Sequence, residues 1–167
     1  ARGLPIVPSR FVERGTTLHL RELLETAGWD EAVIKPTVSG GARYTYRVNR
    51  ASAAEIQAIV QPLLAAEAFL VQPFVPAIMT TGEDSLMVFG GSYSHAIRKI
   101  AKPGDFRVQD DHGGKAHAYE PTPAQIELAE RAFAACDPRP VYGRVDLVAD
   151  GAGGWLIMEL ELIEPEL

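Results

Sequence analysis

The stretch VYGRVDLVADGAGGWLIMELELIEPEL, residues Val141–Leu167, closes the chain and decides how the rest of the sequence is interpreted. Polar and apolar residues alternate on both sides of a Gly-rich turn at residues 150–154. Two alternating runs joined by such a turn are typical of a β-hairpin. We therefore expect two neighbouring strands at this end of the chain.

Three carboxylates on this hairpin are not explained by an apolar core. Asp146 shares a face with Arg144 in the first strand, and Glu159 shares a face with Glu161 in the second. Because burying an unpaired carboxylate is expensive, acids among Leu, Ile and Met usually hold a cation. Oxygen ligands without a nearby His or Cys cluster suit Mg²⁺ or Mn²⁺ better than zinc. The alternative is that these acids form the solvent face of an edge hairpin.

Composition limits the class of protein. The 167 residues are 47% hydrophobic and 23% charged, which is enough to bury a core as one compact unit or two small lobes. A net charge of -6 argues against nucleic acid as a partner. The lone Cys136 excludes a disulfide framework, and no apolar run approaches the roughly 20 residues of a membrane span. We therefore expect a cytoplasmic protein with no membrane partner.

Sequence patterns along the chain predict mixed helix and strand. Residues 1–30 read as an extended connector followed by a short helix, which Thr16 or Thr17 would cap and Gly28 would end. Strands are expected over residues 31–36, in the stretch after the glycine loop that ends at Val48, over residues 69–75, and twice between residues 83 and 100 around a turn at Gly90 and Gly91. Capping boxes at Ser52/Glu55 and at Thr122/Gln125 predict two helices, which end at about Ala68 and Ala135. Residues 102–117 read as polar and flexible.

A lysine ahead of a glycine loop suggests phosphate binding. Lys35 stands near the end of an apolar strand and is followed by TVSGGAR, residues 37–43. Its ammonium could reach a phosphate while the backbone N–H groups of Ser39, Gly40 and Gly41 close over it. The segment is not a Walker A loop. A strand-end lysine in solvent beside an ordinary turn explains the same residues equally well.

More positive charge follows in the second half of the chain. Arg98, Lys99 and Arg107 lie close to or within the stretch expected to be flexible. Such residues are rarely buried, so most are simply surface charges. Together with the carboxylates of the hairpin, however, a lysine, arginines and a glycine loop outline a site for a nucleoside triphosphate and its metal ion.

Five motifs in this order resemble the ATP-grasp superfamily, and among its members the ligases related to glutathione synthetase and the ribosomal-protein glutamate ligases. They are Lys35 ahead of Ser39–Gly41, QPFV at Gln72–Val75, RKI with GDFRVQ at Arg98–Ile100 and Gly104–Gln109, RVDLV at Arg144–Val148, and ELE at Glu159–Glu161. The order is more specific than any single motif, and it covers nearly the whole chain.

This resemblance implies an α+β ATP-grasp fold with a mainly antiparallel sheet and two lobes. Residues 31–76 would form the small lobe and residues 77–167 the large lobe, with ATP between them and residues 1–30 as a connector. The chain starts without Met. The resemblance therefore also suggests a piece of a longer protein, without the N-terminal domain on which substrate choice depends in the superfamily.

The resemblance assigns a role to each matching residue in the nucleotide site. Lys35 would contact the α- and β-phosphates, and Ser39, Gly40, Gly41 and Ala42 would form a flexible flap over the triphosphate. The linker whose backbone reads the adenine edge corresponds to Gln72, Pro73, Phe74 and Val75, and it normally begins with Glu rather than Gln.

The remaining roles concern catalysis and the metal. Lys99 and Arg107 match the basic pair that steadies the transferring phosphate, and Asp146, Glu159 and Glu161 match the metal ligands. Glu161 stands where these ligases usually have Asn. The tail IEPEL is similar to the ending of ATP-grasp enzymes that close O-ureido-serine to cycloserine.

The function implied is that of a ligase that depends on ATP and Mg²⁺ (or Mn²⁺). It would activate the carboxylate of an amino acid, a peptide or another small-molecule substrate as an acyl phosphate for attack by an amine or similar nucleophile. Two alternatives stay open: a nucleotide-binding module without ligase activity, and a structural or interaction domain. Assembly into a homo-oligomer is also open. Because the chain alone need not be active, nucleotide binding is the fairer test.

Overall fold

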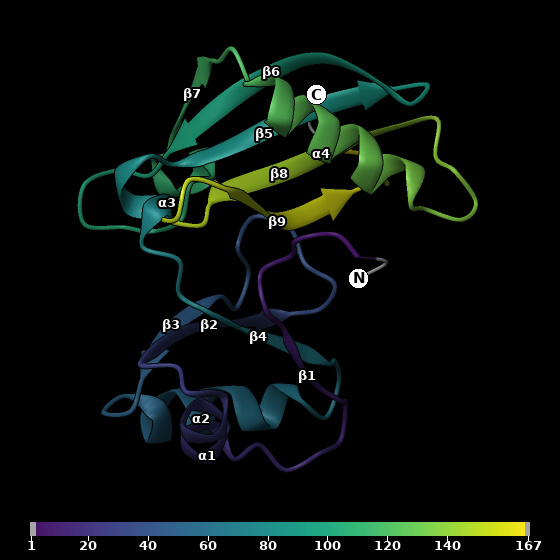
Figure 1. The fold of residues 1–167 in the computed structure, drawn as a ribbon. Coiled ribbons are helices and arrows are strands. Elements are labelled where there is room, and N and C mark those ends of the chain that lie inside the picture. The colour runs from purple at the N-terminus through teal and green to yellow at the C-terminus, as the bar shows by residue number, and fades with distance from the viewer. Residues whose placement is uncertain (1–2, 166–167) are drawn as a thin grey trace. The chain divides into compact units, whose positions relative to one another are not determined.

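The computed structural model describes residues 3–165, and the chain divides into two compact units (Figure 1). The small unit comprises Pro8–Phe74, and the large unit comprises the residues on either side of it. Residues 8–30, part of the stretch 1–30 expected from the sequence to be a connector and a short helix, belong to the small unit and supply Val12, Leu18, Leu20 and Leu24 to its core. Among the described helices, none has the length and apolar character needed to cross a membrane.

The small unit is an antiparallel sheet with two helices on one face (Figure 1). Its elements are β1 (Arg10–Val12), α1 (Leu20–Ala27), β2 (Glu31–Pro36), β3 (Tyr46–Asn49), α2 (Ala53–Leu63) and β4 (Phe69–Pro73), with the strand order β1-β4-β2-β3. Alternate residues of β2 and β4, among them Ile34 and Phe69, are buried in the core. Side chains alternate between the faces of a strand, so Lys35 faces away from this core.

The large unit is a five-stranded antiparallel sheet covered on one face by α4 (Figure 1). Its elements are α3 (Ala77–Thr80), β5 (Glu83–Phe89), β6 (Ser92–Ile100), the 3₁₀ helix η1 (Asp110–His112), β7 (Lys115–Ala118), α4 (Pro123–Ala134), β8 (Tyr142–Ala149) and β9 (Trp155–Glu161), with the strand order β7-β6-β5-β8-β9. Leu128, Ala132 and Phe133 of α4 pack on Leu86 and Val145 of the sheet. The terminal hairpin is therefore β8 and β9, as the sequence predicts.

The capping box predicted for α4 is confirmed. The Gln125 backbone N–H donates to the Thr122 hydroxyl, while Gln125 Oε1 accepts from the Thr122 backbone N–H at 2.8 Å. Pro123 occupies the first turn, where a missing N–H costs nothing. Gln125 also has a tertiary role, because its Nε2 donates to Asp84 Oδ2 at 2.8 Å. The cap thus ties the start of α4 to the sheet.

The cap expected for α1 is wrong. The helix begins at Leu20, and the Thr16 hydroxyl bonds to the Glu13 carbonyl instead of to a helical N–H. Gln57 of α2 accepts the Leu20 N–H at 2.9 Å, so a side chain distant in sequence satisfies the start of the helix. The predicted stop is correct, since Gly28 ends the helix in the left-handed conformation with φ 70°.

The capping box expected for α2 is also wrong, and the helix ends at Leu63 rather than Ala68. The Ser52 hydroxyl bonds to Asn49, and it caps no N–H of the helix. Asn49 Oδ1 accepts from the backbone N–H groups of Ala51 and Ser52 at 2.9 and 3.0 Å. An Asn one turn earlier therefore supports the turn into the helix.

Residues 102–117, expected to be flexible, contain η1 and the start of β7. β7 pairs with β6 at the edge of the sheet, and Val108 is buried. A Cβ on Gly114 would lie 2.0 Å from the Val108 carbonyl oxygen, so only glycine fits there. Close backbone packing orders this segment despite its polar sequence.

Candidate metal and phosphate site

A β-bulge in β9 directs the hairpin acids to one face of the large sheet. Leu147 pairs with Ile157, whereas the neighbouring Asp146 pairs with Glu159, so Met158 is the extra residue. Ile157 belongs to the core under α4. In an unbroken strand Glu159 would share the face of Ile157, because residues two apart point the same way. The bulge turns Glu159 away from the core and beside Asp146.

The cross-strand register gathers charged groups on the face opposite α4. Paired residues of neighbouring antiparallel strands share a face. The pairs are Glu83 with Lys99, Ser85 with Asp146, Asp146 with Glu159, and Arg144 with Glu161. We call these seven residues the acidic face.

The three predicted metal ligands come together on the acidic face. Asp146, Glu159 and Glu161 each offer an oxygen, and these oxygens lie within 4.8 Å of one another. Arg144 Nε and Nη2 donate to Asp146 at 2.8 and 2.9 Å, and Nη2 also donates to Glu161 at 2.7 Å. Burial alone would lower the pKa of Arg144, but the hydrogen bonds to Asp146 and the nearby negative charges raise it. Arg144 is thus a fixed cation beside two of the acids.

The resemblance leads us to expect Asn at the position of Glu161, and the contacts of Glu161 explain how its charge is tolerated. Burial raises the pKa of Glu161, Arg144 opposes this, and the charges of Asp146 and Glu159 add to it. The Arg144–Glu161 contact therefore offsets a charge that an Asn would not bring.

Glu83 and Lys99 complete the charged cluster. Lys99 Nζ lies 3.4 Å from Glu83 Oε1 and 3.8 Å from Asp146 Oδ2, and its side chain is 14% exposed. Burial, followed by the charge of Asp146, raises the pKa of Glu83 to about 8, although the ammonium of Lys99 opposes the change. Burial is the main cause, and the charge of Asp146 adds to it, so both favour the neutral form of the Glu83 carboxyl group.

The acidic face has the chemistry that a hard divalent cation requires. Four carboxyl groups, those of Glu83, Asp146, Glu159 and Glu161, gather here with the cations of Lys99 and Arg144. The Ser85 hydroxyl, directly across from Asp146, is buried and has no hydrogen-bond partner in the described structure. Converging carboxylate oxygens and a buried hydroxyl without a partner among the described residues fit Mg²⁺, which keeps part of its water shell.

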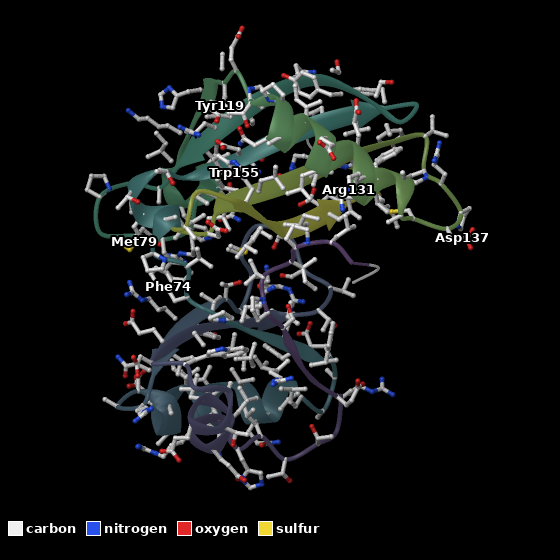
Figure 2. The ribbon with its side chains drawn as sticks, viewed as in Figure 1. Phe74, Met79, Tyr119, Arg131, Asp137 and Trp155 are labelled. Atoms are coloured by element: carbon white, nitrogen blue, oxygen red, sulfur yellow. The ribbon has the colours of Figure 1, made fainter. Side chains whose placement is uncertain are left out.

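The opposite face of the same strands carries a self-contained ion pair. Arg98 donates to both oxygens of Asp84 at 2.6 and 2.9 Å and stacks on the ring of Tyr119, 4.0 Å from its centroid (Tyr119 is labelled in Figure 2). Asp84 also accepts from Gln125. These hydrogen bonds and the ring contact therefore join the pair to other side chains of the same protein. Of the two adjacent basic residues, only Lys99 therefore faces the acids.

Arg107, the second basic residue of the predicted catalytic pair, lies in the loop after β6 and is held by Asp105. Its Nε and Nη2 donate to the two Asp105 oxygens at 3.0 and 2.8 Å. The hydrogen bond from Arg107 lowers the pKa of Asp105 well below its usual range. The side chain of Arg107 is 34% exposed. The structure thus places Arg107 in an accessible ion pair, whereas Lys99 lies among the acids.

The predicted phosphate loop belongs to the small unit. Lys35 lies on β2, half-buried, and the loop after β2 contains Ser39, Gly40 and Gly41. Gly41, Ala42 and Tyr44 have φ values of 58°, 54° and 52°. Left-handed conformations are unfavourable for Ala and Tyr, so this loop keeps its conformation only where other contacts stabilise it.

Arg43, the last residue of TVSGGAR, forms an ion pair with Glu67. Arg43 Nη1 and Nη2 donate to the two Glu67 oxygens at 2.8 and 2.6 Å. The Ser39 hydroxyl, expected in the flap, donates to the Arg43 carbonyl. The Arg43–Glu67 ion pair thus connects the loop to the segment just before β4.

The predicted adenine linker, Gln72 to Val75, runs from β4 of the small unit into the large unit. Gln72 is buried and its Nε2 donates to the Ser9 hydroxyl at 3.0 Å, and Pro73 ends β4. The Phe74 N–H donates to the Glu31 carbonyl, and the Val75 carbonyl accepts from Ile78. Arg47 lies 3.8 Å above the ring of Phe74, which Figure 2 labels. The linker is therefore anchored from both of its ends.

Sequence reasoning did not assign a role to Glu83, Ser85 or Arg144. In the sequence Glu83 and Asp84 directly precede the apolar run SLMVF, and only the structure shows that both belong to the strand. The residue across from Glu83 could be identified only from the register of β5 and β6.

Comparison with known proteins places the chain in a family. Residues 6–137 match the family described as prokaryotic glutathione synthetase, ATP-grasp domain. The chain belongs to this family. The α+β ATP-grasp fold predicted from the sequence is confirmed, and ligases of this family use ATP and Mg²⁺. The hairpin of β8 and β9 lies beyond the matched residues, so the relatives described next bear on it more directly.

The relatives are ATP-grasp ligases. Cycloserine biosynthesis protein DcsG of Streptomyces lavendulae is 33% identical and aligns with 100% of this chain and 60% of its own length. The crystal structure of D-cycloserine synthetase DcsG matches 98% of this chain and 59% of its own, with a TM-score of 0.87 and 31% identity. D-alanine–D-alanine ligase from Bacillus anthracis matches 97% of this chain and 53% of its own, with a TM-score of 0.74 and 17% identity, which shows a shared fold.

The chain thus spans between 53% and 60% of the length of these relatives. The tail IEPEL of this chain, on which part of the predicted resemblance rests, is described up to Pro165, while Glu166 and Leu167 lie outside the described residues.

Proposed function

We propose that this chain is the ATP- and Mg²⁺-binding part of a ligase that activates a carboxylate as an acyl phosphate for attack by an amine or a similar nucleophile. The observation that carries the proposal is the acidic face, where Asp146, Glu159 and Glu161 converge and Lys99 lies beside them. Membership of the ATP-grasp family supports the same reaction class.

In the proposed chemistry a substrate carboxylate oxygen forms a bond to the γ-phosphorus of ATP, the bond from that phosphorus to the β-phosphate oxygen breaks, and ADP leaves. The amine or similar nucleophile then attacks the carbonyl carbon of the acyl phosphate and loses a proton, and the carbon–oxygen bond to phosphate breaks to release inorganic phosphate. Bound Mg²⁺ would supply charge neutralisation and orientation of the phosphate oxygens. Asp146, Glu159 and Glu161 would hold the ion through their converging oxygens.

The basic residues would carry the rest of the charge. Lys99 would donate to the transferring phosphoryl group, because its ammonium already lies next to the candidate metal ligands. Arg107 would join it from its accessible pair with Asp105. Lys35 and the loop containing Ser39, Gly40 and Gly41 would bind the remaining phosphates, and residues 72–75 the adenine. Positioned positive charge is the main requirement for phosphoryl transfer.

A cyclising ligase for a small amino-acid derivative is the narrower candidate. The similarity to the D-cycloserine synthetase DcsG, at 31% identity and a TM-score of 0.87, favours it over a peptide ligase. In such an enzyme the attacking nucleophile and the activated carboxylate belong to one molecule.

Nucleotide binding by the chain itself tests the proposal. Titration calorimetry with Mg-ATP should show saturable binding by the wild-type chain and none, or binding at least about tenfold weaker, by Asp146→Asn and Glu159→Gln, since each loses a charged ligand. A matched control is Glu127→Gln, which removes one negative charge from a side chain that is 72% exposed on α4.

Equal Mg-ATP affinity in all four proteins would refute the assignment of the metal site, and no binding by the wild type would refute nucleotide binding by this chain. ATP turnover with a panel of amino acids, in a protein that includes any preceding domain, then separates a ligase from a nucleotide-binding module.

A further inference from the structure

The start of β5 is built to place Glu83 against Lys99. Gly82 has a φ of 84°, and a Cβ there would lie 2.3 Å from the Lys99 carbonyl oxygen. Only glycine permits both this conformation and this approach. The next residue, Glu83, is 7% exposed and pairs with Lys99 across the two strands. The backbone thus fixes one buried carboxyl group beside one particular lysine.

Glu83 and Asp146 orient the Lys99 ammonium but do not occupy all of its hydrogen-bond donors. Its ammonium lies 3.4 Å from Glu83 Oε1 and 3.8 Å from Asp146 Oδ2. Strong charge-assisted hydrogen bonds are shorter, about 2.7–2.9 Å. A lysine side chain has four rotatable bonds, and burial to 14% exposure between two acids restricts them. The ammonium is therefore held in place with donors left for another acceptor.

The neighbouring ion pair shows what a purely structural contact looks like in the same strands. Arg98 and Asp84 make two short hydrogen bonds, of 2.6 and 2.9 Å, and both have further partners in Tyr119 and Gln125. Glu83 lacks such short hydrogen bonds among the described residues, where its hydrogen bond is the long one that it accepts from Lys99. A stability role explains Asp84 well and Glu83 poorly, because a buried and weakly paired acid is destabilising.

We propose that Glu83 is a positioning residue, which holds the Lys99 ammonium beside the metal-binding carboxylates so that it meets the terminal phosphate of bound ATP. The inference rests on the proposed function. Without Glu83, the remaining described acceptor of Lys99 is Asp146, so the lysine would pair with a candidate metal ligand and compete with the cation. Phosphotransferases of other folds orient a phosphate-binding lysine with a glutamate in the same way.

Two substitutions at Glu83 distinguish the effect of its hydrogen-bond acceptor from the effect of its negative charge. Glu83→Met removes the oxygen acceptor at similar length, whereas Glu83→Gln keeps an oxygen that can accept from Lys99. Calorimetry with a non-hydrolysable ATP analogue and with ADP, each with Mg²⁺, measures the preference for the third phosphate. Glu83→Met should lower this preference by about tenfold, the value of one contact to a charged group, and Glu83→Gln should keep it near that of the wild type.

Coupling to Lys99 and a control on the opposite face complete the test. In a Lys99→Met background, Glu83→Met should cause no further loss of preference, because Glu83 acts through the lysine. Asp84→Asn, one residue along the same strand, should lower the melting temperature and leave the preference unchanged.

Equal losses for both nucleotides, or a further loss in the Lys99→Met background, would overturn the positioning role while leaving the proposed function intact. Absence of nucleotide binding by the wild type would instead overturn the proposed function, and the positioning role with it.

Discussion

The strongest pH prediction concerns Glu83, which lies at the start of β5 in the large unit. Burial and the charge of Asp146 raise its pKa from the ordinary value of 4.5 to about 8. Between these two values the folded protein keeps a proton that the unfolded chain has lost. Because stability falls with rising pH wherever the folded state binds more protons, Glu83 should destabilise the large unit progressively from about pH 4.5 to pH 8.

The size of the effect follows from the same pKa values. Each unit between them corresponds to about 1.4 kcal/mol, so between about pH 5 and pH 7 the wild type should lose roughly 2–3 kcal/mol relative to a variant that cannot ionise at this position. Glu83→Gln is that variant. We expect it to match the wild type near pH 5 and to be clearly more stable near pH 7.

Urea unfolding of the large unit measures this difference. Trp155 of β9 is half-buried against the core of the large unit and is labelled in Figure 2. The second tryptophan, Trp29, packs in the small unit, so a Trp29→Phe background leaves Trp155 as the reporter. Parallel pH profiles for Glu83 and Glu83→Gln proteins would refute the reasoning. Mg²⁺ should flatten the wild-type profile, because a bound cation favours the charged carboxylate.

Three further predictions concern packing and the loop. Thr122→Ala removes the capping hydroxyl of α4 and should cost about 1 kcal/mol in urea unfolding of the large unit. Phe133→Ala empties a fully buried position in the same core and should cost about 3–5 kcal/mol in the same assay. Arg43→Ala breaks the exposed pair with Glu67 and should leave the melting temperature unchanged while speeding amide hydrogen exchange over residues 38–45; unchanged exchange would show that the pair does not hold the loop.

Local signals in the sequence succeeded where one short segment determines the geometry. The capping box at Thr122 and Gln125, the helix stop at Gly28 and the turn at Gly90 and Gly91 all appear in the structure. They failed at Thr16 and Ser52, because Gln57 accepts the Leu20 N–H at the start of α1 and Asn49 accepts the Ala51 and Ser52 N–H groups before α2. A distant side chain can replace a local cap, and a sequence pattern does not reveal it.

The charged pairs on β5 and β6 depend on a bulge that no local pattern indicates. Counting back from the turn at Gly90 and Gly91 in an unbroken hairpin would pair Glu83 with Arg98. In the structure Met87 pairs with His95 and Val88 with Tyr93, so the register shifts by one residue and Glu83 pairs with Lys99. A one-residue shift moves every side chain beyond it to the other face.

The family and the terminal hairpin could be predicted from the sequence alone, because the order of motifs, the alternation of polar and apolar residues and the turn residues can all be read along the chain. Which acids and bases meet depends on the tertiary structure. The bulge at Met158 brings Glu159 to Asp146, and the register shift in β6 brings Lys99 to Glu83. Both depend on how neighbouring strands pack and pair, which is a property of the sheet and of no single strand.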